Sequence, residues 1–104
     1  MPKTGFPLSA KGYYSVITKE TTIVNRLGLH TRAAAKLAKE ASHYSSKVSV
    51  SKGIDQVDGK SIMGLMMISA TQGSTIELVV EGEDEVEAMD ALINLIANHF
   101  EEEE

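Results

Sequence analysis

The stretch that decides the fold is VITKETTIVNRLGLHTRAAAKLAKEASHYS, residues 16–45. Its first part, Val16–Val24, is rich in Thr, Ile and Val and is typical of a strand. A turn at Asn25–Gly28 follows, and from His30 to Ser45 the apolar residues recur at helical spacing. They are Ala34, Leu37, Ala38 and Ala41. A strand is therefore predicted to lead into a helix that is buried on one side.

A hairpin and a short helix are predicted next along the chain. Lys47–Lys52 alternates polar and apolar residues, Gly53 supplies a turn residue, and Ile54–Asp58 can return as the partner strand. Ser61–Ser69 is mostly apolar and is predicted to form a short helix. Ser61 is placed to cap the N-terminus of that helix with its hydroxyl.

The last part of the sequence predicts one more strand and a long helix. Thr75–Glu81 alternates as a strand, and Asp84 then opens a helix with several acidic residues near its positive dipole end. The apolar stripe of this helix is predicted to comprise Val86, Met89, Ile93, Ile96, Ala97 and Phe100. The order β-α-β-β-α-β-α indicates an open-faced α+β fold, with helices on one face of a single sheet.

Three segments are expected along the chain. Residues 1–15 contain both prolines and no apolar period, and they are predicted to form a flexible leader. Residues 16–100 form the folded domain. Glu101–Glu104 is an acidic run at the negative dipole end of the last helix, so this tail is predicted to fray.

Composition and charge exclude several classes of function. The 104 residues suffice for one domain, and the absence of cysteine excludes disulfides and thiolate chemistry and is typical of a reducing compartment. The net charge is −5, and removing the four glutamates of Glu101–Glu104 leaves −1, so nucleic-acid binding is not expected. The longest apolar stretch, Ile62–Ala70, is too short to cross a membrane, and the first twenty residues lack a secretory apolar block. We therefore expect a cytoplasmic protein.

The junction Leu27–Lys36 carries the residues best suited to chemistry. It places His30 at the start of a helix, where backbone N–H groups lack partners and the dipole end is positive. Arg32 adds a guanidinium suited to phosphate oxygens, and Lys36 adds a second positive charge. A neutral imidazole in such an anion site can accept a phosphoryl group without a metal ion or a deep cleft. The alternative is that His30 only begins a helix and has no chemical role.

The motifs of this chain resemble those of the HPr family, the histidine-containing phosphocarriers of the bacterial phosphoenolpyruvate-dependent phosphotransferase system. Gly28–Ala34 (GLHTRAA) resembles the active-site signature of that family, and Lys60–Met66 (KSIMGLM) its regulatory serine motif. Ala70–Gly73 and Ile76–Asp84 resemble its later half. The likeness extends over residues 16–100.

The resemblance implies both a fold and a role for each motif. The implied fold is an open-faced β-sandwich, a four-stranded antiparallel sheet under three helices. His30 would receive a phosphoryl group from Enzyme I on Nδ1, with the help of Arg32, and pass it to an Enzyme IIA component. Ser61 would be modified by HPr kinase/phosphorylase where that enzyme exists. The implied docking residues are Leu29, Ile62, Met63 and Met66. Such a protein is a stoichiometric carrier and not an enzyme, and no cofactor or metal ion is expected.

Two details leave the pathway open. Ala33 stands where the family commonly has proline, but both residue types suit a first helical turn, so folding and phosphorylation should survive. Arg32–Ala34 resembles the nitrogen-related branch of the family. Lys60–Gly64, in contrast, resembles the kinase-regulated sugar branch.

Alternative functions also remain open at this stage. Ser61 can be a helix cap and nothing more, which contributes about 1 kcal/mol whether or not a kinase acts on it. The chain could be a regulatory adaptor controlled through Ser61, with His30 secondary. It could also be a small module that binds a phosphorylated metabolite at the loop–helix junction.

Overall fold

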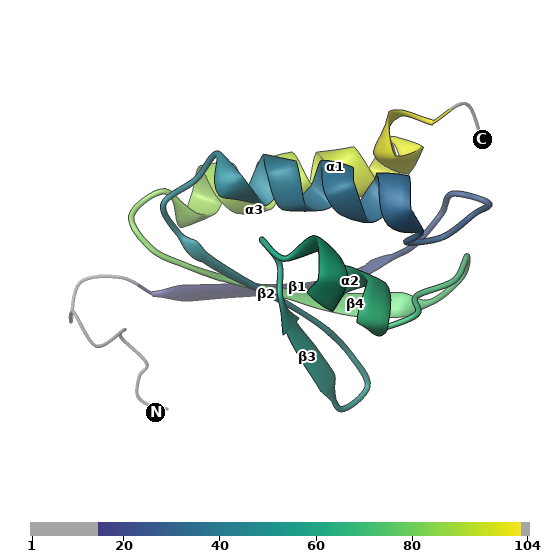
Figure 1. Ribbon diagram of the computed structural model, residues 1–104. Coiled ribbons are helices and arrows are strands. Elements are labelled where there is room, and N and C mark those ends of the chain that lie inside the picture. The colour runs from purple at the N-terminus through teal and green to yellow at the C-terminus, as the bar shows by residue number, and fades with distance from the viewer. Residues whose placement is uncertain (1–14, 103–104) are drawn as a thin grey trace.

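The computed structural model describes residues 15–102 and has the element order predicted from the sequence (Figure 1). The elements are β1 (Val16–Thr22), α1 (Thr31–Ser42), β2 (Lys47–Lys52), β3 (Asp55–Asp58), α2 (Ile62–Met67), β4 (Thr75–Glu81), α3 (Glu85–Ala97) and the 3-10 turn η1 (His99–Glu101). The strands form one antiparallel sheet in the order β1-β4-β2-β3, and the three α-helices cover one of its faces. The expected open-faced fold is confirmed. Residues 1–14 of the expected leader and 103–104 of the expected tail lie outside the described residues.

The sheet is organised around β4, which pairs with β1 on one side and β2 on the other. Val80 of β4 lies opposite Ile17 of β1 and Val48 of β2. Ile76 and Leu78 are buried as Val80 is, while the residues between them are partly exposed. This alternation fixes the register, because a slip of one residue would turn the apolar side chains away from the helices.

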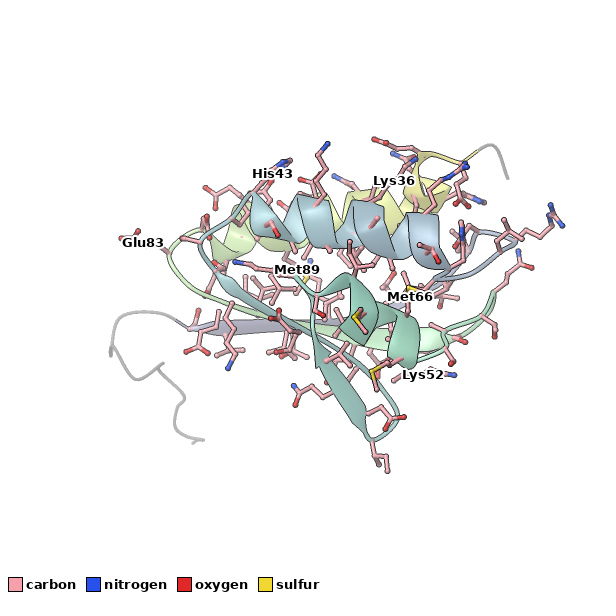
Figure 2. All side chains as sticks on the ribbon, viewed as in Figure 1. Lys36, His43, Lys52, Met66, Glu83 and Met89 are labelled. Atoms are coloured by element: carbon pink, nitrogen blue, oxygen red, sulfur yellow. The ribbon has the colours of Figure 1, made fainter. Side chains whose placement is uncertain are left out.

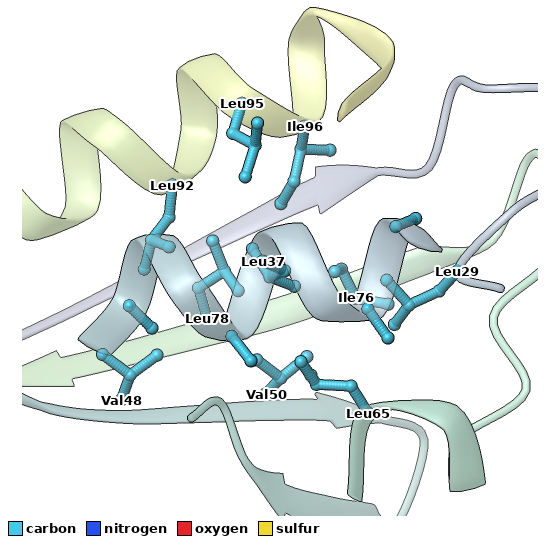
Figure 3. Close-up of a cluster of buried hydrophobic side chains, with 14 of the residues drawn as sticks. Leu29, Leu37, Val48, Val50, Leu65, Ile76, Leu78, Leu92, Leu95 and Ile96 are labelled. Carbon is cyan, nitrogen blue, oxygen red and sulfur yellow. The ribbon is translucent and has the colours of Figure 1, made fainter. Parts of the chain in front are cut away.

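The core lies between the sheet and the helices (Figure 3). Leu37 of α1 lies in the middle of this core, and the other buried residues of α1 are small. They are Ala33, Ala34, Ala38 and Ala41. Because alanine side chains occupy little space, α1 lies in contact with both α2 and α3. None of the α-helices within residues 15–102 is long and apolar enough to cross a membrane.

The buried face of α3 agrees with the predicted stripe at Met89 and Ile96 and differs from it at Val86 and Ala97. Its buried apolar residues are Ala88, Met89, Leu92, Leu95 and Ile96. Val86 and Ala97, both expected in the buried stripe, are exposed. The reason is that Glu85 begins the buried face, where its carboxylate accepts the backbone N–H of Gly82 at 3.0 Å. Positions three, four, seven and eleven residues further on then share that face.

The chain after α3 folds back onto the domain. The residues of His99–Glu101 all have left-handed φ values, between 54° and 65°, and Phe100 is completely buried. The Lys36 ammonium of α1 donates a hydrogen bond to the Phe100 carbonyl oxygen at 2.9 Å. Glu101 and Glu102, which were expected to belong to a frayed tail, therefore follow a segment that packs on the domain. Burial of the Phe100 ring holds this segment in place, whereas the prediction for the tail considered only the repulsion between its glutamates and the negative end of the helix dipole.

The opposite end of α3 is tied to the loop that follows α1. The Asp84 carboxylate accepts hydrogen bonds from the backbone N–H groups of Ser45 at 2.9 Å and Ser46 at 3.0 Å, and from the Ser46 hydroxyl. The Ser46 hydroxyl is the main cause, and the backbone donors the next, of a pKa of Asp84 below its ordinary value. This carboxylate joins two loops that are distant in the sequence.

Candidate functional site

A closed loop positions the residue at the start of α1. The buried Asn25 side chain donates a hydrogen bond to the Gly28 carbonyl oxygen at 2.8 Å. Gly28 has φ of +70°, and a Cβ there would lie 2.7 Å from the Ala70 carbonyl oxygen. That same oxygen accepts the Leu29 N–H at 2.8 Å. Glycine is therefore required at this turn, and the chain enters α1 in one fixed direction.

His30 is the N-cap residue of α1, one position before the observed first helical residue Thr31, whereas the sequence predicted His30 as the first residue of the helix. Its backbone is extended, with φ of −83° and ψ of −177°, and its carbonyl accepts the N–H of Ala34 at 2.8 Å. The His30 side chain does not cap the helix. Within residues 15–102 the N–H groups of Thr31, Arg32 and Ala33 have no hydrogen-bond acceptor. The positive end of α1 is thus open for an anion.

An open depression of about 780 Å³ lies over this helix start. His30, Arg32 and Lys36 all line it, as the sequence predicted for a phosphate-binding surface. Arg32 is exposed and has no ion-pair partner among residues 15–102. Lys36, labelled in Figure 2, is instead engaged with the C-terminal segment through the Phe100 carbonyl. Arg32 is therefore an exposed cation that is available to a bound anion.

The structure adds Glu102, which the sequence did not single out. Its carboxylate oxygen Oε2 lies 2.5 Å from Nε2 of His30, and its Oε1 accepts the Asn25 amide at 3.0 Å. Burial raises the pKa of Glu102, but the hydrogen bonds from His30 and Asn25 outweigh it and leave that pKa below its ordinary value. A run of four identical residues offers no reason to select one of them. Only the apolar Phe100 just before the run hinted that the segment folds back.

Ser61 occupies the corresponding position at the start of α2. Its backbone is extended, and its hydroxyl accepts the N–H of Gly64 at 3.0 Å, so the predicted N-cap is confirmed. The helix α2 packs beside α1, below its N-terminal half in Figure 1. Ser61 therefore lies on an element that neighbours the helix of His30.

The apolar residues of α2 face outward to a large extent. Leu65 alone is buried in this helix. The exposed residues are Ile62 at 42%, Met63 at 77%, Met66 at 42% and Met67 at 77%. Met67 was not among the expected docking residues, although the short length of α2 leaves most of its side chains outside the core. Met66 is labelled in Figure 2.

Leu29, which was expected among the docking residues, is buried. This side chain is only 5% exposed and belongs to the core, where Figure 3 shows it beside Ile76. The hydrogen bond from its N–H to Ala70 turns the side chain inward. Leu27, two residues earlier, is 59% exposed and lines the depression next to His30. The apolar residue near the histidine is thus Leu27.

Comparison with known proteins agrees with this arrangement. The family model described as the PTS HPr component phosphorylation site matches residues 17–98. The phosphocarrier protein HPr of Cupriavidus necator is 54% identical over 89 residues, which cover 86% of this chain and 100% of that protein. HPr of Pseudomonas aeruginosa is 50% identical over 86 residues, covering 82% and 96%. A crystal structure of HPr from Thermoanaerobacter tengcongensis has 42% sequence identity and a TM-score of 0.81, covering 85% and 99%.

The fold and the comparisons together define a phosphocarrier of the phosphotransferase system, which is a non-catalytic component of that system. The chain belongs to the HPr family. The relatives bear the general name HPr, so the nitrogen-related branch is not specifically supported.

Proposed function

We propose that His30 is the residue of this phosphocarrier that accepts a phosphoryl group from Enzyme I and passes it to an Enzyme IIA component. The observation that carries the proposal is the position of His30 at the uncapped start of α1, on a surface depression and 29% exposed at its side chain. Nδ1 of His30 has no hydrogen-bond partner among residues 15–102. A lone pair on that nitrogen can attack phosphorus as the bond to the donor breaks.

The groups around His30 supply charge compensation for this step. The N–H groups of Thr31, Arg32 and Ala33 and the positive dipole end of α1 favour phosphoryl oxygens. The exposed Arg32 guanidinium can add charge-assisted hydrogen bonds. Since each ~1.4 kcal/mol of extra phosphohistidine stabilisation slows onward release tenfold, a shallow and partly satisfied site suits a carrier. The open depression is of this kind.

The proposal is tested by incubating the protein with Enzyme I, Mg²⁺ and phosphoenolpyruvate. One acid-labile, base-stable phosphoryl group should be gained, and His30→Ala should abolish the gain. His43→Ala is the matched control, because His43 lies just after the other end of α1 with an exposed side chain. Arg32→Ala should slow transfer about tenfold with nearly unchanged thermal unfolding. Undiminished phosphorylation of the His30→Ala protein would disprove the assignment.

Ser61 is proposed as a regulatory site on the docking surface. The support is its motif, Lys60–Met66, and its place at the start of a helix that exposes Ile62, Met63, Met66 and Met67. Methionine suits a surface that must fit several partners. A phosphate on Ser61 would add about −1.5 to −2 charges beside these residues and repel an acidic partner surface.

The regulatory proposal is tested by the affinity for Enzyme I. Ser61→Asp should weaken binding, because it places a negative charge beside the apolar surface of α2. Ser61→Asn is the neutral control, since asparagine retains a capping oxygen. Equal affinity of the two variants would count against a charge switch. HPr kinase/phosphorylase is the proposed modifying enzyme, and a cytoplasmic location is proposed from the absence of cysteine in the sequence.

A further inference from the structure

The C-terminal segment brings a carboxylate to the histidine ring, on the nitrogen that the proposed phosphoryl transfer does not use. Oε2 of Glu102 lies 2.5 Å from Nε2 of His30. The Glu102 side chain is only 12% exposed, so the contact is largely shielded from water. Neither the family signature nor the dipole argument requires this contact.

The segment that carries Glu102 is anchored at two points. The Phe100 ring is completely buried, and the Phe100 carbonyl accepts a hydrogen bond from Lys36. The left-handed backbone of His99, Phe100 and Glu101 then turns the chain back toward the start of α1. Placement of Glu102 is therefore built into the fold and does not depend on the chance position of a mobile end.

A second residue fixes the orientation of the carboxylate. The Asn25 side-chain nitrogen donates to Oε1 of Glu102 at 3.0 Å and to the Gly28 carbonyl oxygen at 2.8 Å. Both amide protons of this buried asparagine are thus directed to acceptors. The loop that positions His30 and the carboxylate that contacts its ring are held by the same side chain.

The chemistry of the contact assigns a proton. An ionised carboxylate only accepts hydrogen bonds, so the ring nitrogen that faces it must carry hydrogen. In a neutral imidazole one nitrogen carries the proton and the other a lone pair. With the proton on Nε2 of His30, the lone pair lies on Nδ1, which is the nitrogen without a partner among residues 15–102.

We propose that Glu102 is a positioning residue for phosphoryl transfer, which holds the His30 ring in the Nε2–H tautomer and supports the positive charge that the ring gains on phosphorylation. This inference rests on the proposed function of His30. Asn25 acts behind it by orienting the carboxylate. The role is comparable to that of a carboxylate that orients a catalytic histidine in a hydrolase.

The balance of the transfer step shows where Glu102 acts. The Nδ1 lone pair forms the new N–P bond while the donor bond to phosphorus breaks, and the electron pair of that bond leaves with the donor. Nε2 keeps its proton, so the phosphorylated ring is a cation beside the Glu102 carboxylate. In onward transfer the N–P electron pair returns to Nδ1, and a neutral imidazole leaves. A ring that remains protonated on Nε2 is the better leaving group, so the contact supports both halves of the cycle.

The test is nitrogen NMR of the His30 ring in the full chain at about pH 8, where an ordinary imidazole is neutral. The unmodified protein should show a protonated Nε2 and an unprotonated Nδ1. Glu102→Gln should shift the population toward Nδ1–H, because the new amide can donate to Nε2. Phosphoryl transfer should fall about ten- to a hundred-fold in this variant. Glu102→Asp retains a carboxylate and should therefore keep part of the Nε2–H population and part of the transfer rate.

Glu101→Gln is the matched control. It removes the same charge one position earlier, from a side chain that is 71% exposed and 3.8 Å from Lys36. It should leave the tautomer unchanged. An unchanged tautomer in a Glu102→Gln protein that is still phosphorylated at the normal rate would overturn the role of Glu102 alone. Failure of the unmodified protein to accept a phosphoryl group would overturn the proposed function of His30, and this role with it.

Discussion

Two helix starts in this molecule have similar backbones and opposite side-chain behaviour. His30 before α1 and Ser61 before α2 both adopt extended conformations, and both carbonyls accept the N–H four residues later. The Ser61 hydroxyl also accepts the N–H of Gly64, whereas the His30 side chain caps nothing in its helix. One helix start is closed by its own sequence, and the other is left open.

The difference follows from what each helix needs for stability. The helix α2 has six residues and buries one of them, so a cap of about 1 kcal/mol is a large share of its stability. The helix α1 has twelve residues and a continuous buried face. It can form without a cap, which leaves its first N–H groups available to a ligand. The molecule therefore lacks a stabilising N-cap at the one helix start where the proposed phosphate site needs free N–H groups.

The most direct way to break the comparison is to install a cap at the open start. His30→Ser should abolish phosphoryl acceptance altogether while it stabilises α1 relative to His30→Ala by about 1 kcal/mol. Both variants lose the contact with Glu102, so their difference isolates the cap. Chemical unfolding and a phosphorylation assay with Enzyme I measure the two effects. Equal stability of the two variants would mean that this helix start cannot accept a serine cap.

A second variant tests how the open start is positioned. Gly28→Ala should lower the free energy of unfolding by more than about 2 kcal/mol, since it adds left-handed strain of about 1–2 kcal/mol and a clash with the Ala70 carbonyl. Gly53→Ala is the control, because Gly53 has φ of +62° and no atom within 4 Å of an added Cβ. Urea denaturation of both proteins gives the comparison. Equal losses would show that the Ala70 carbonyl moves aside easily.

At the start of α2, which Ser61 caps, removing the cap should lower stability. Ser61→Ala should lower the free energy of unfolding by about 1 kcal/mol, because the N–H of Gly64 loses its acceptor. The effect should concentrate in α2, as faster hydrogen exchange of the Gly64 amide. Ser61→Thr retains a hydroxyl and is the control. If Gly64 exchanges equally fast in the serine and alanine proteins, the cap contributes nothing.

The start of α3 offers the smallest effect and a third arrangement. Asp84 precedes this helix but directs its carboxylate to Ser45 and Ser46. Its folded-state pKa lies below the ordinary 3.8, so it contributes stability above that pH, and the contribution is lost as the pH falls through the lower folded value. Asp84→Asn should therefore destabilise the protein more at neutral pH than near pH 3. Thermal unfolding at the two pH values measures this, and a pH-independent loss would contradict it.

The sequence predicted the elements well where local patterns decide them. The strand Thr75–Glu81 and the Ser61 cap are found as expected, because alternation and capping depend on neighbouring residues. The buried face of α3 was wrong at Val86, because the inward turn of Glu85 depends on Gly82 and not on apolar spacing. Leu29 was misplaced for a similar reason, since its hydrogen bond to Ala70 spans forty-one positions.

The candidate site was predictable in part. His30 and Arg32 were found because the loop, the helix start and the cations are adjacent in the sequence. Glu102 was missed because its contact spans seventy-two positions and depends on burial of Phe100. A single sequence does not show which glutamate of an acidic run returns to the domain. The position of His30 is therefore determined by neighbouring residues in the sequence, whereas the position of Glu102 depends on contacts between distant residues.

The buried alanine residues of α1 determine how close this helix lies to its neighbours, and so they also determine where His30 lies at the surface. Ala33, Ala34 and Ala41 are fully buried on a helix that contacts α2 and α3, so we expect larger side chains at these positions to overpack the core. Ala34→Val is expected to displace α1 away from the core, and the His30 imidazole at the start of that helix would be displaced with it. The volume of these buried side chains therefore constrains the position of the phosphate site, although the side chains themselves lie in the core.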